Sequence, residues 1–189
     1  GRGTRHSFWW RWSRVVQRRP WPAAAIALAI LVILTIPVFS LRLGFGDAGN
    51  NAKGDTTREA YDLLSTGFGP GFNGPLLVAA STPGGDSDIA VLKTVEETLK
   101  KTPGVAFVTD PIRNGAGDAA ILQVYPTTSP QDEATSDLVE TIRSDVLPSV
   151  AGAERLQPKV GGATASVVDF ASYTADRMPI FFGAVLGLS

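Results

Sequence analysis

The sequence contains no cysteine, and its 189 residues include a single histidine, His6. Without cysteine the chain can form no disulfide, zinc-thiolate site, iron–sulfur cluster or cysteine nucleophile. With histidine confined to position 6, the rest of the chain offers no Ser-His-Asp triad and no histidine-rich metal site. We therefore expect neither an enzyme nor a protein that holds a cofactor or a metal ion.

Acidic residues are absent from the first 46 positions, whereas six arginines lie within the first 21. The formal net charge of −1 is thus an average over two unlike parts. Since six of the 17 basic residues and none of the 18 acidic residues precede position 22, the remainder carries a net charge of −7. The chain is divided into a basic leader and an acidic body.

Residues 22–41 form an uncharged run of 20 that separates these two parts. As a helix this run would be roughly 30 Å long, which is the thickness of the hydrocarbon core of a bilayer. A buried helix of a soluble protein is the alternative, but such a helix is rarely apolar on every side. A cleaved signal peptide usually has a shorter apolar core, of about 7 to 15 residues. The sequence predicts a transmembrane helix over residues 22–43.

Residues 1–21 form a basic, tryptophan-rich segment before this helix. Because arginine-rich flanks stay on the cytoplasmic side, we expect a cytoplasmic N-terminus and an extracytoplasmic location for residues 44–177. Phe8, Trp9, Trp10 and Trp12 alternate with Arg11 and Arg14, a pattern typical of a helix that lies in the membrane interface. Basic residues among aromatics also occur in nucleic-acid-binding proteins, but the neighbouring apolar run favours lipid.

A second uncharged run occupies residues 178–189. A core strand is one interpretation of it, and the first turns of another membrane helix are the other. We favour the membrane helix, and expect the chain to be a segment of a longer, multi-pass protein of the cell membrane. The helix predicted over residues 163–177 would lead into this run.

Between the two apolar runs the pattern is that of a folded α+β domain. Residues 46–55 indicate a turn-rich linker. Thr56 and Glu59 form a capping box that predicts a short helix ending at Gly67. The spacing of apolar residues then predicts, in order, a strand over 76–80, a helix over 87–101, strands over 105–109 and 119–125 joined by a turn, a helix over 131–147 and a strand over 156–160. This order is βαββαβ, that of a ferredoxin-like unit.

Residues 67–76, with the sequence GFGPGFNGPL, hold four glycines and two prolines. The segment is not a phosphate-binding loop, because the Lys and Ser/Thr of that motif are missing. We predict a tight turn in which Phe68 and Phe72 either fix the segment to the domain, which we favour, or face a ligand path. Phe68, Phe72 and Asn73 are the candidate substrate-path residues, and Gly67, Gly69 and Gly71 are candidate hinge residues.

Four segments together resemble the MMPL branch of the resistance-nodulation-division (RND) transporters of actinobacteria. They are RRPW at 18–21, RLGFGDAGN at 42–50, TTREAYDLL at 56–64 and GFGPGFNGPL at 67–76. The resemblance covers most of the chain and is strongest over residues 18–76, whereas the later domain matches by pattern only.

The resemblance implies that the chain is the start of one half of a transporter, and the arginine-rich leader suggests the second half. In that family each half has a membrane helix, then an extracytoplasmic porter domain, then further helices. It implies proton-driven export of lipids or other hydrophobic molecules. The implied partners are the bilayer, the remaining membrane helices, a second porter domain and the hydrophobic substrate, with no nucleic acid.

Acidic residues in this chain do not suggest a proton relay or a calcium site. Asp169 and Asp176 precede the second apolar run, and we interpret them as surface residues. Asp47, Asp55 and Asp62 lack the spacing of an EF-hand loop, which favours a solvated acidic surface. A different class of function also fits the sequence: a membrane-anchored extracytoplasmic binding or scaffold module that transports nothing.

Overall fold

A computed structural model describes residues 8–37 and 46–189, and the side chains of residues 8–11 and 15 lie outside that description. The chain divides into two compact units, residues 1–42 and 43–189. In the first unit, helix α1 (Phe8–Arg18) is followed by helix α2 (Pro20–Thr35). Proline is compatible with the first turn of α2, because the N–H it lacks has no partner there.

Helix α2 has no buried residue, and its exposed side chains are almost all apolar. Among the described residues, no single helix is both long and apolar enough to qualify as a membrane span. Residues Trp12–Arg18 and Pro20–Thr35 qualify only together, as a pair bent by 109°. The predicted span over 22–43 extends into residues 38–45, outside the described residues, and stays a prediction.

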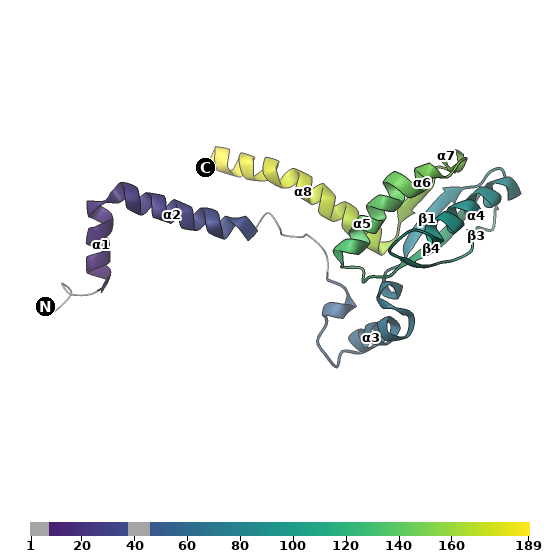
Figure 1. Cartoon of the computed structure of the whole chain (residues 1–189), viewed down its shortest axis with the longest axis horizontal. Coiled ribbons are helices and arrows are strands. Elements are labelled where there is room, and N and C mark those ends of the chain that lie inside the picture. The colour runs from purple at the N-terminus through teal and green to yellow at the C-terminus, as the bar shows by residue number, and fades with distance from the viewer. Residues whose placement is uncertain (1–7, 38–45) are drawn as a thin grey trace. The chain divides into compact units, whose positions relative to one another are not determined.

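The second unit is an α+β domain built on an antiparallel sheet (Figure 1). Its strands are β1 (Leu76–Ser81), β2 (Val105–Val108), β3 (Ile112–Arg113), β4 (Ala119–Pro126) and β5 (Lys159–Gly161). The strand order is β2-β4-β1-β5, and β3 pairs with β4 from the β2–β4 connection. Every pair is antiparallel, including β2 with β4.

One face of the sheet carries the core. Burial alternates along β1 and β4, so that Leu76 and Val78 of β1 pack beside Leu122 and Val124 of β4. Helix α4 (Asp86–Lys100) and helix α5 (Glu133–Thr141) supply the opposing layer. Full burial of such side chains contributes about 1.5–3 kcal/mol each. This layer fixes the sheet, and the described helices α4 and α5 both lie on this one face.

Several predicted elements differ from the structure in detail. The helix predicted over 131–147 is interrupted: after α5 the chain forms a π-helical turn (Ile142–Val146) and then α6 (Leu147–Ser149). Pro148 lacks the N–H that a continuous α-helix would use there. Leu156, predicted to begin a strand, instead ends the short helix α7 (Ala153–Leu156), and β5 starts at Lys159. The turn predicted between β2 and β4 contains the short strand β3.

The helix predicted from Thr56 is α3 (Thr56–Phe68), but Thr56 is not its cap. Asp55 caps it instead, because its side chain accepts a hydrogen bond from the Thr57 N–H at 2.8 Å. At the other end of the domain, α8 (Ala163–Leu188) is one helix of 26 residues. The predicted boundary between residues 177 and 178 therefore falls inside a helix.

Candidate functional site

The glycine-rich segment connects α3 to the first strand of the sheet. Gly69 follows α3 with φ +100° and ψ 156°, a backbone conformation that is essentially restricted to glycine. The chain then forms the 3-10 helix η3 (Pro70–Asn73). A Cβ on Gly71 would lie 1.9 Å from the carbonyl oxygen of Pro126 in β4. Only glycine lets η3 lie this close to the end of β4.

This close approach builds a stack of four rings, Phe68, Phe72, Tyr125 and Phe107, which we call the aromatic stack. The ring centroids are 4.7 Å apart for Phe68 and Phe72, 4.9 Å for Phe72 and Tyr125, and 5.9 Å for Tyr125 and Phe107. These are the separations at which aromatic pairs attract beyond their area of contact. The stack joins α3 and η3 to strands β4 and β2.

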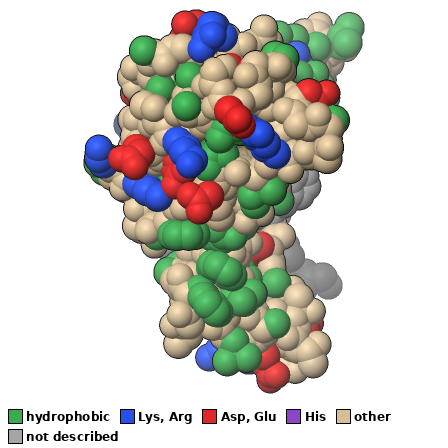
Figure 2. Space-filling model, turned by 90° about the vertical axis from the view of Figure 1, so that its right-hand side faces the viewer, with side chains coloured by type: hydrophobic (Ala, Val, Ile, Leu, Met, Phe, Trp, Pro, Cys, Tyr) green, Lys and Arg blue, Asp and Glu red, His purple; other side chains and the backbone are tan. Residues whose placement is uncertain are grey.

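The two ends of the aromatic stack are open to solvent. Phe68 is 69% exposed and Phe107 is 57% exposed, whereas Phe72 and Tyr125 are half-buried. On the same helix α3, Leu63 is 73% exposed. Figure 2 shows hydrophobic side chains gathered over the lower part of the molecule, where Figure 1 places α3. Exposed apolar side chains on this scale are typical of a surface that meets an apolar partner or ligand.

The face of the sheet opposite α4 and α5, which also carries Tyr125, continues this apolar surface. Ile112 of β3 is 52% exposed and pairs in register with Ile121 of β4, which is 36% exposed. A shallow hollow of about 400 Å³ lies on this face and is lined in part by Ala79, Ile121 and Lys159.

The structure shows how Phe68 and Phe72 are placed, and their contact with a substrate stays a prediction. Phe72 is held between two rings and fixes η3 to the sheet, while Phe68 presents most of its side chain outward. Tyr125 and Phe107 were not predicted. Phe107 of β2 and Tyr125 of β4 are directly paired in the sheet. The register of β2 against β4 shifts between Val105 and Phe107, so a regular alternation of side chains along β2 does not predict this pairing. The one feature of the sequence that could have indicated their role is that each of the two predicted strands contains an aromatic residue.

Asn73 differs from the other candidate path residues. Its side-chain amide donates one hydrogen bond to the carbonyl oxygen of Tyr61 at 3.1 Å and another to Oγ of Ser65 at 3.0 Å. Both amide hydrogens are thus used to join η3 to α3. Asn73 therefore stabilises the packing of η3 on α3, and its contact with substrate stays a prediction.

The linker before α3 is more ordered than its composition indicates. Asp47 caps a 3-10 turn, η2 (Ala48–Asn50), by accepting from the Gly49 N–H at 2.8 Å. Arg58 of α3 donates to the carbonyl oxygen of Gly49 and pairs with Asp62. Burial, together with the hydrogen bond and charge of Asp47, raises the pKa of Tyr61 to about 12. The acidic residues that could have suggested calcium thus serve as caps and ion-pair partners.

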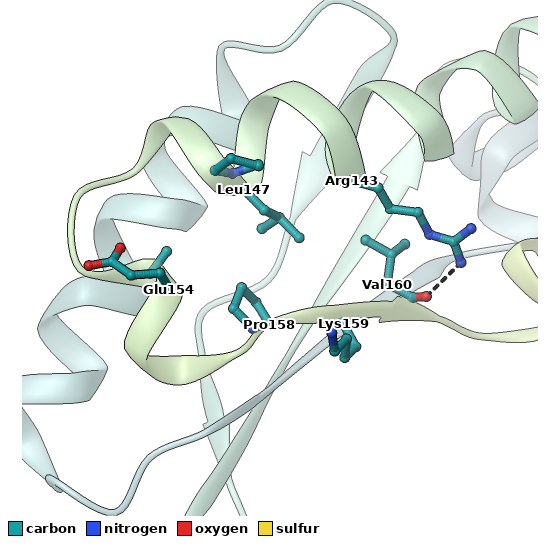
Figure 3. Close-up of a pocket in the computed structure, with 8 residues that line it drawn as sticks. Arg143, Leu147, Glu154, Pro158, Lys159 and Val160 are labelled. Atoms are coloured by element: carbon teal, nitrogen blue, oxygen red, sulfur yellow. Dashed lines mark hydrogen bonds between the residues drawn. The ribbon is translucent and has the colours of Figure 1, made fainter.

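A second hollow, of about 510 Å³, lies between β5 and the helices α6 and α7 (Figure 3). Leu147, Pro158 and Val160 line it together with Arg143 and Lys159. Figure 3 shows Arg143 reaching from its helical turn to the strand, where it donates to the carbonyl oxygen of Val160 at 2.9 Å. In the part of the chain that the structure describes, no three His, Asp or Glu side chains are placed to hold a metal ion.

Comparison with known proteins gives the context of these features. The chain is 36% identical over 179 residues to membrane protein YdfJ of Bacillus subtilis, covering 94% of this chain and 24% of that protein. It is 31% identical over 180 residues to the mycolic acid-containing lipids exporter MmpL11 of Mycolicibacterium smegmatis, covering 93% of this chain and 19% of that protein. It is 28% identical over 184 residues to the heme uptake protein MmpL11 of Mycobacterium tuberculosis, covering 94% and 18%. No family model matches the chain.

These relatives are named as membrane or transport proteins and not as enzymes, in agreement with the expectation from the sequence. The chain spans about a quarter or less of their length. The similarity includes nearly all of this chain, and so extends over both the apolar helix α2 and the α+β domain.

Proposed function

We propose that this chain, a homologue of the MmpL proteins, supplies the porter domain of a membrane exporter. The homology confirms the resemblance to the MMPL family that the sequence indicated. The exporter carries lipids or other hydrophobic molecules and is driven by proton flow. The name of the Mycolicibacterium smegmatis relative, a lipid exporter, supports this substrate class. The observation that carries the proposal is the aromatic stack, whose end rings Phe68 and Phe107 are exposed beside an apolar sheet face.

The porter domain is, in this proposal, a ferredoxin-like unit. The order of its main elements, β1-α4-β2-β4-α5-β5, and the antiparallel order β2-β4-β1-β5 both support that assignment. Such a unit has a layer of helices on one face of the sheet and an open second face. The open face here carries Phe107, Ile112 and Ile121, which gives an apolar substrate a surface to pass along.

The membrane arrangement follows the charge pattern. Helix α2 crosses the bilayer, α1 lies at the cytoplasmic interface, and residues 44–177 lie outside the cytoplasm. The exposed, uniformly apolar surface of α2 supports this placement. The apolar end of α8 enters the membrane as the next helix, and the partners of the domain are the remaining membrane helices and a second porter domain of the same multi-pass protein.

Transport works by movement of the domain relative to the membrane helices. The candidate hinge is the glycine-rich segment, and within it a Cβ added at Gly67 or Gly69 would meet no neighbouring atom within 4 Å, unlike one added at Gly71. Opening and closing at Gly69 would carry Phe68 and α3 away from the ring of Phe72. The path for the substrate would thereby widen and narrow at the aromatic stack.

The test uses the complete exporter in cells and measures export of its hydrophobic substrate. Phe68→Ala and Phe107→Ala remove the two exposed ends of the aromatic stack and leave the buried core intact. We expect both variants to insert normally and to lose most of their export. Lys93→Ala is the control, because Lys93 is an exposed residue of α4, outside both the stack and α8. Full export by both stack variants would refute the proposed path. Absence of export by the unaltered complete protein would instead favour a membrane-anchored scaffold that transports nothing.

A further inference from the structure

Helix α8 begins in the domain and then leaves it. Thr164 and Ala165 in its first turn are buried, and Val168 packs against the core. From Asp169 onward the side chains are half-buried or exposed. The 19 residues after Asp169 extend the helix by about 28 Å at about 1.5 Å per residue. Asp169 therefore lies where a long helical arm departs from the domain.

Arg143 holds α8 at this point. Its Nη1 donates to Oδ1 of Asp169 at 2.5 Å and its Nη2 donates to Oδ2 at 3.0 Å. The same Nη2 donates to the carbonyl oxygen of Val160 in β5 at 2.9 Å. One guanidinium thus joins three elements: the turn that carries Arg143, the edge strand β5 and helix α8. A bidentate pair of this kind fixes orientation as well as distance.

The electrostatics of the pair agree with the geometry. The hydrogen bond to Arg143 and the charge of Arg143 lower the pKa of Asp169. The hydrogen bond to Asp169, with the charges of Asp169 and Glu140, raises the pKa of Arg143. Both groups are therefore held in their charged forms. Arg143 itself lies in the π-helical turn Ile142–Val146, a local widening of the helix that often accompanies a functional position.

A second contact joins the base of α8 to the glycine-rich segment. Oγ1 of the buried Thr164 donates to the carbonyl oxygen of Gly74 at 3.1 Å. The base of α8 is thereby connected on one side to the segment that carries Phe72 and on the other side to the edge strand of the sheet. A displacement of α8 at Asp169 would therefore pull on both the glycine-rich segment and β5.

We propose that Arg143 is a positioning residue for transport, which clamps α8 to β5 through Asp169 so that movement of the membrane-side part of α8 is passed to the sheet. The inference rests on the proposed transport function. Without the clamp, α8 is held by its first two turns, and the helical arm can swing while the sheet stays in place. The guanidinium is required, because a lysine ammonium cannot form the bidentate pair and bind Val160 in the same geometry.

The clamp contributes to coupling far more than to folding. The side chains of Arg143 and Asp169 are 27% and 56% exposed, and ion pairs at such positions add little to global stability. Variants that break the pair should therefore fold. A change in α8 alone is then distinguishable from general unfolding.

The first measurement is hydrogen exchange of the full chain in detergent, followed in peptides that cover residues 163–175. We expect Arg143→Gln, Arg143→Lys and Asp169→Asn each to speed exchange there by about fivefold, the scale expected when one local charged contact is lost. Exchange in β1 and α4 should not change. Arg113→Gln is the matched control, since it removes another arginine–aspartate pair, Arg113 with Asp86, and changes the net charge by the same amount as Arg143→Gln.

The second measurement is export by the complete transporter that carries the same variants. We expect the three clamp variants to lose most of their export and Arg113→Gln to keep it. Unchanged exchange in 163–175 would overturn the clamp, whatever happens to export. Faster exchange with full export would overturn its part in coupling. Failure of the proposed function would be recognised separately, by absence of export in the unaltered transporter, and failure of the proposed path by full export in the Phe68 and Phe107 variants.

Discussion

Substitution of the three candidate hinge glycines by alanine should change the stability of the domain by amounts that differ in size and in sign. The three glycines lie within five residues of one another, yet the structure places them in three different environments. Gly67 is in the last turns of α3, Gly69 has a positive φ, and Gly71 is buried against β4. The same added methyl group should therefore change the free energy of unfolding by a different amount at each position.

Gly71→Ala should be the most destabilising. The new Cβ would lie 1.9 Å from the carbonyl oxygen and 2.6 Å from the carbonyl carbon of Pro126, and both are backbone atoms. Relief requires η3 to move away from β4 by more than about 1 Å, which separates Phe72 from Tyr125. Overpacking of this kind typically costs about 1–3 kcal/mol, and the lost ring contact adds about 0.5–1.5 kcal/mol. We expect a loss of roughly 1.5–4.5 kcal/mol in the free energy of unfolding.

Gly69→Ala should cost less, and Gly67→Ala should stabilise. No atom lies within 4 Å of either added Cβ, so sterics with neighbours do not contribute. At Gly69 the φ of +100° imposes backbone strain of about 1–3 kcal/mol on alanine. At Gly67, alanine is a better helix former than glycine by up to about 1 kcal/mol, a gain reduced by the position near the helix end.

The assay is urea unfolding of the full chain in detergent, followed by far-UV circular dichroism, with hydrogen exchange in β1 and α4 as a second probe that reports the domain alone, since all four tryptophans lie within residues 9–21. The expected order of stability is Gly67→Ala above wild type, wild type above Gly69→Ala, and Gly71→Ala lowest. If Gly71→Ala were as stable as wild type, the close packing of η3 on β4 would be refuted. The result also separates a steric requirement for glycine at Gly71 from a conformational one at Gly69, because only Gly69 combines a positive φ with free space around an added Cβ.

Two further predictions concern charge and orientation. Because the pKa of Asp169 is lowered from its ordinary value of 3.8, the clamp is fully present above that value and is lost as pH falls through the folded pKa; hydrogen exchange in residues 163–175, corrected for the intrinsic pH dependence of exchange, should therefore not change between pH 8 and pH 5, and loosening within that range would contradict the assignment. A cysteine placed at the exposed Ser87 should react with a membrane-impermeant thiol reagent in intact cells; labelling only after lysis would place the domain in the cytoplasm and reverse the proposed orientation.

The order and type of the main elements could be predicted because they depend on local pattern. The apolar spacing of Leu92, Val95 and Leu99 predicted α4 nearly to its ends, since one face of a helix repeats every three to four residues. The helix predicted over 131–147 is present, although periodicity did not predict its π-helical turn at 142–146. The same reasoning was wrong at Leu156, which ends α7 and does not begin a strand.

The candidate site was predicted in part. The glycine-rich composition of residues 67–76 marked the right segment, because so many glycines and prolines exclude regular structure. It could not distinguish Gly71, which needs the absence of a side chain, from Gly69, which needs a positive φ. The composition also could not show that Asn73 donates both amide hydrogens to α3. An asparagine looks the same in the sequence whether its side chain binds a ligand or a neighbouring helix.

Residues close together in the chain were enough to establish the uncharged run at 22–41, the division between basic leader and acidic body, and the identity of most helices and strands. Hydrophobicity and charge act on each segment according to its own composition. The stacking of Phe72 on Tyr125 and the pairing of Arg143 with Asp169 arise only in the folded domain. These partners are distant in sequence, and their contact depends on strand register, a bulge and a π-helical turn, each of which is fixed only when the whole domain packs.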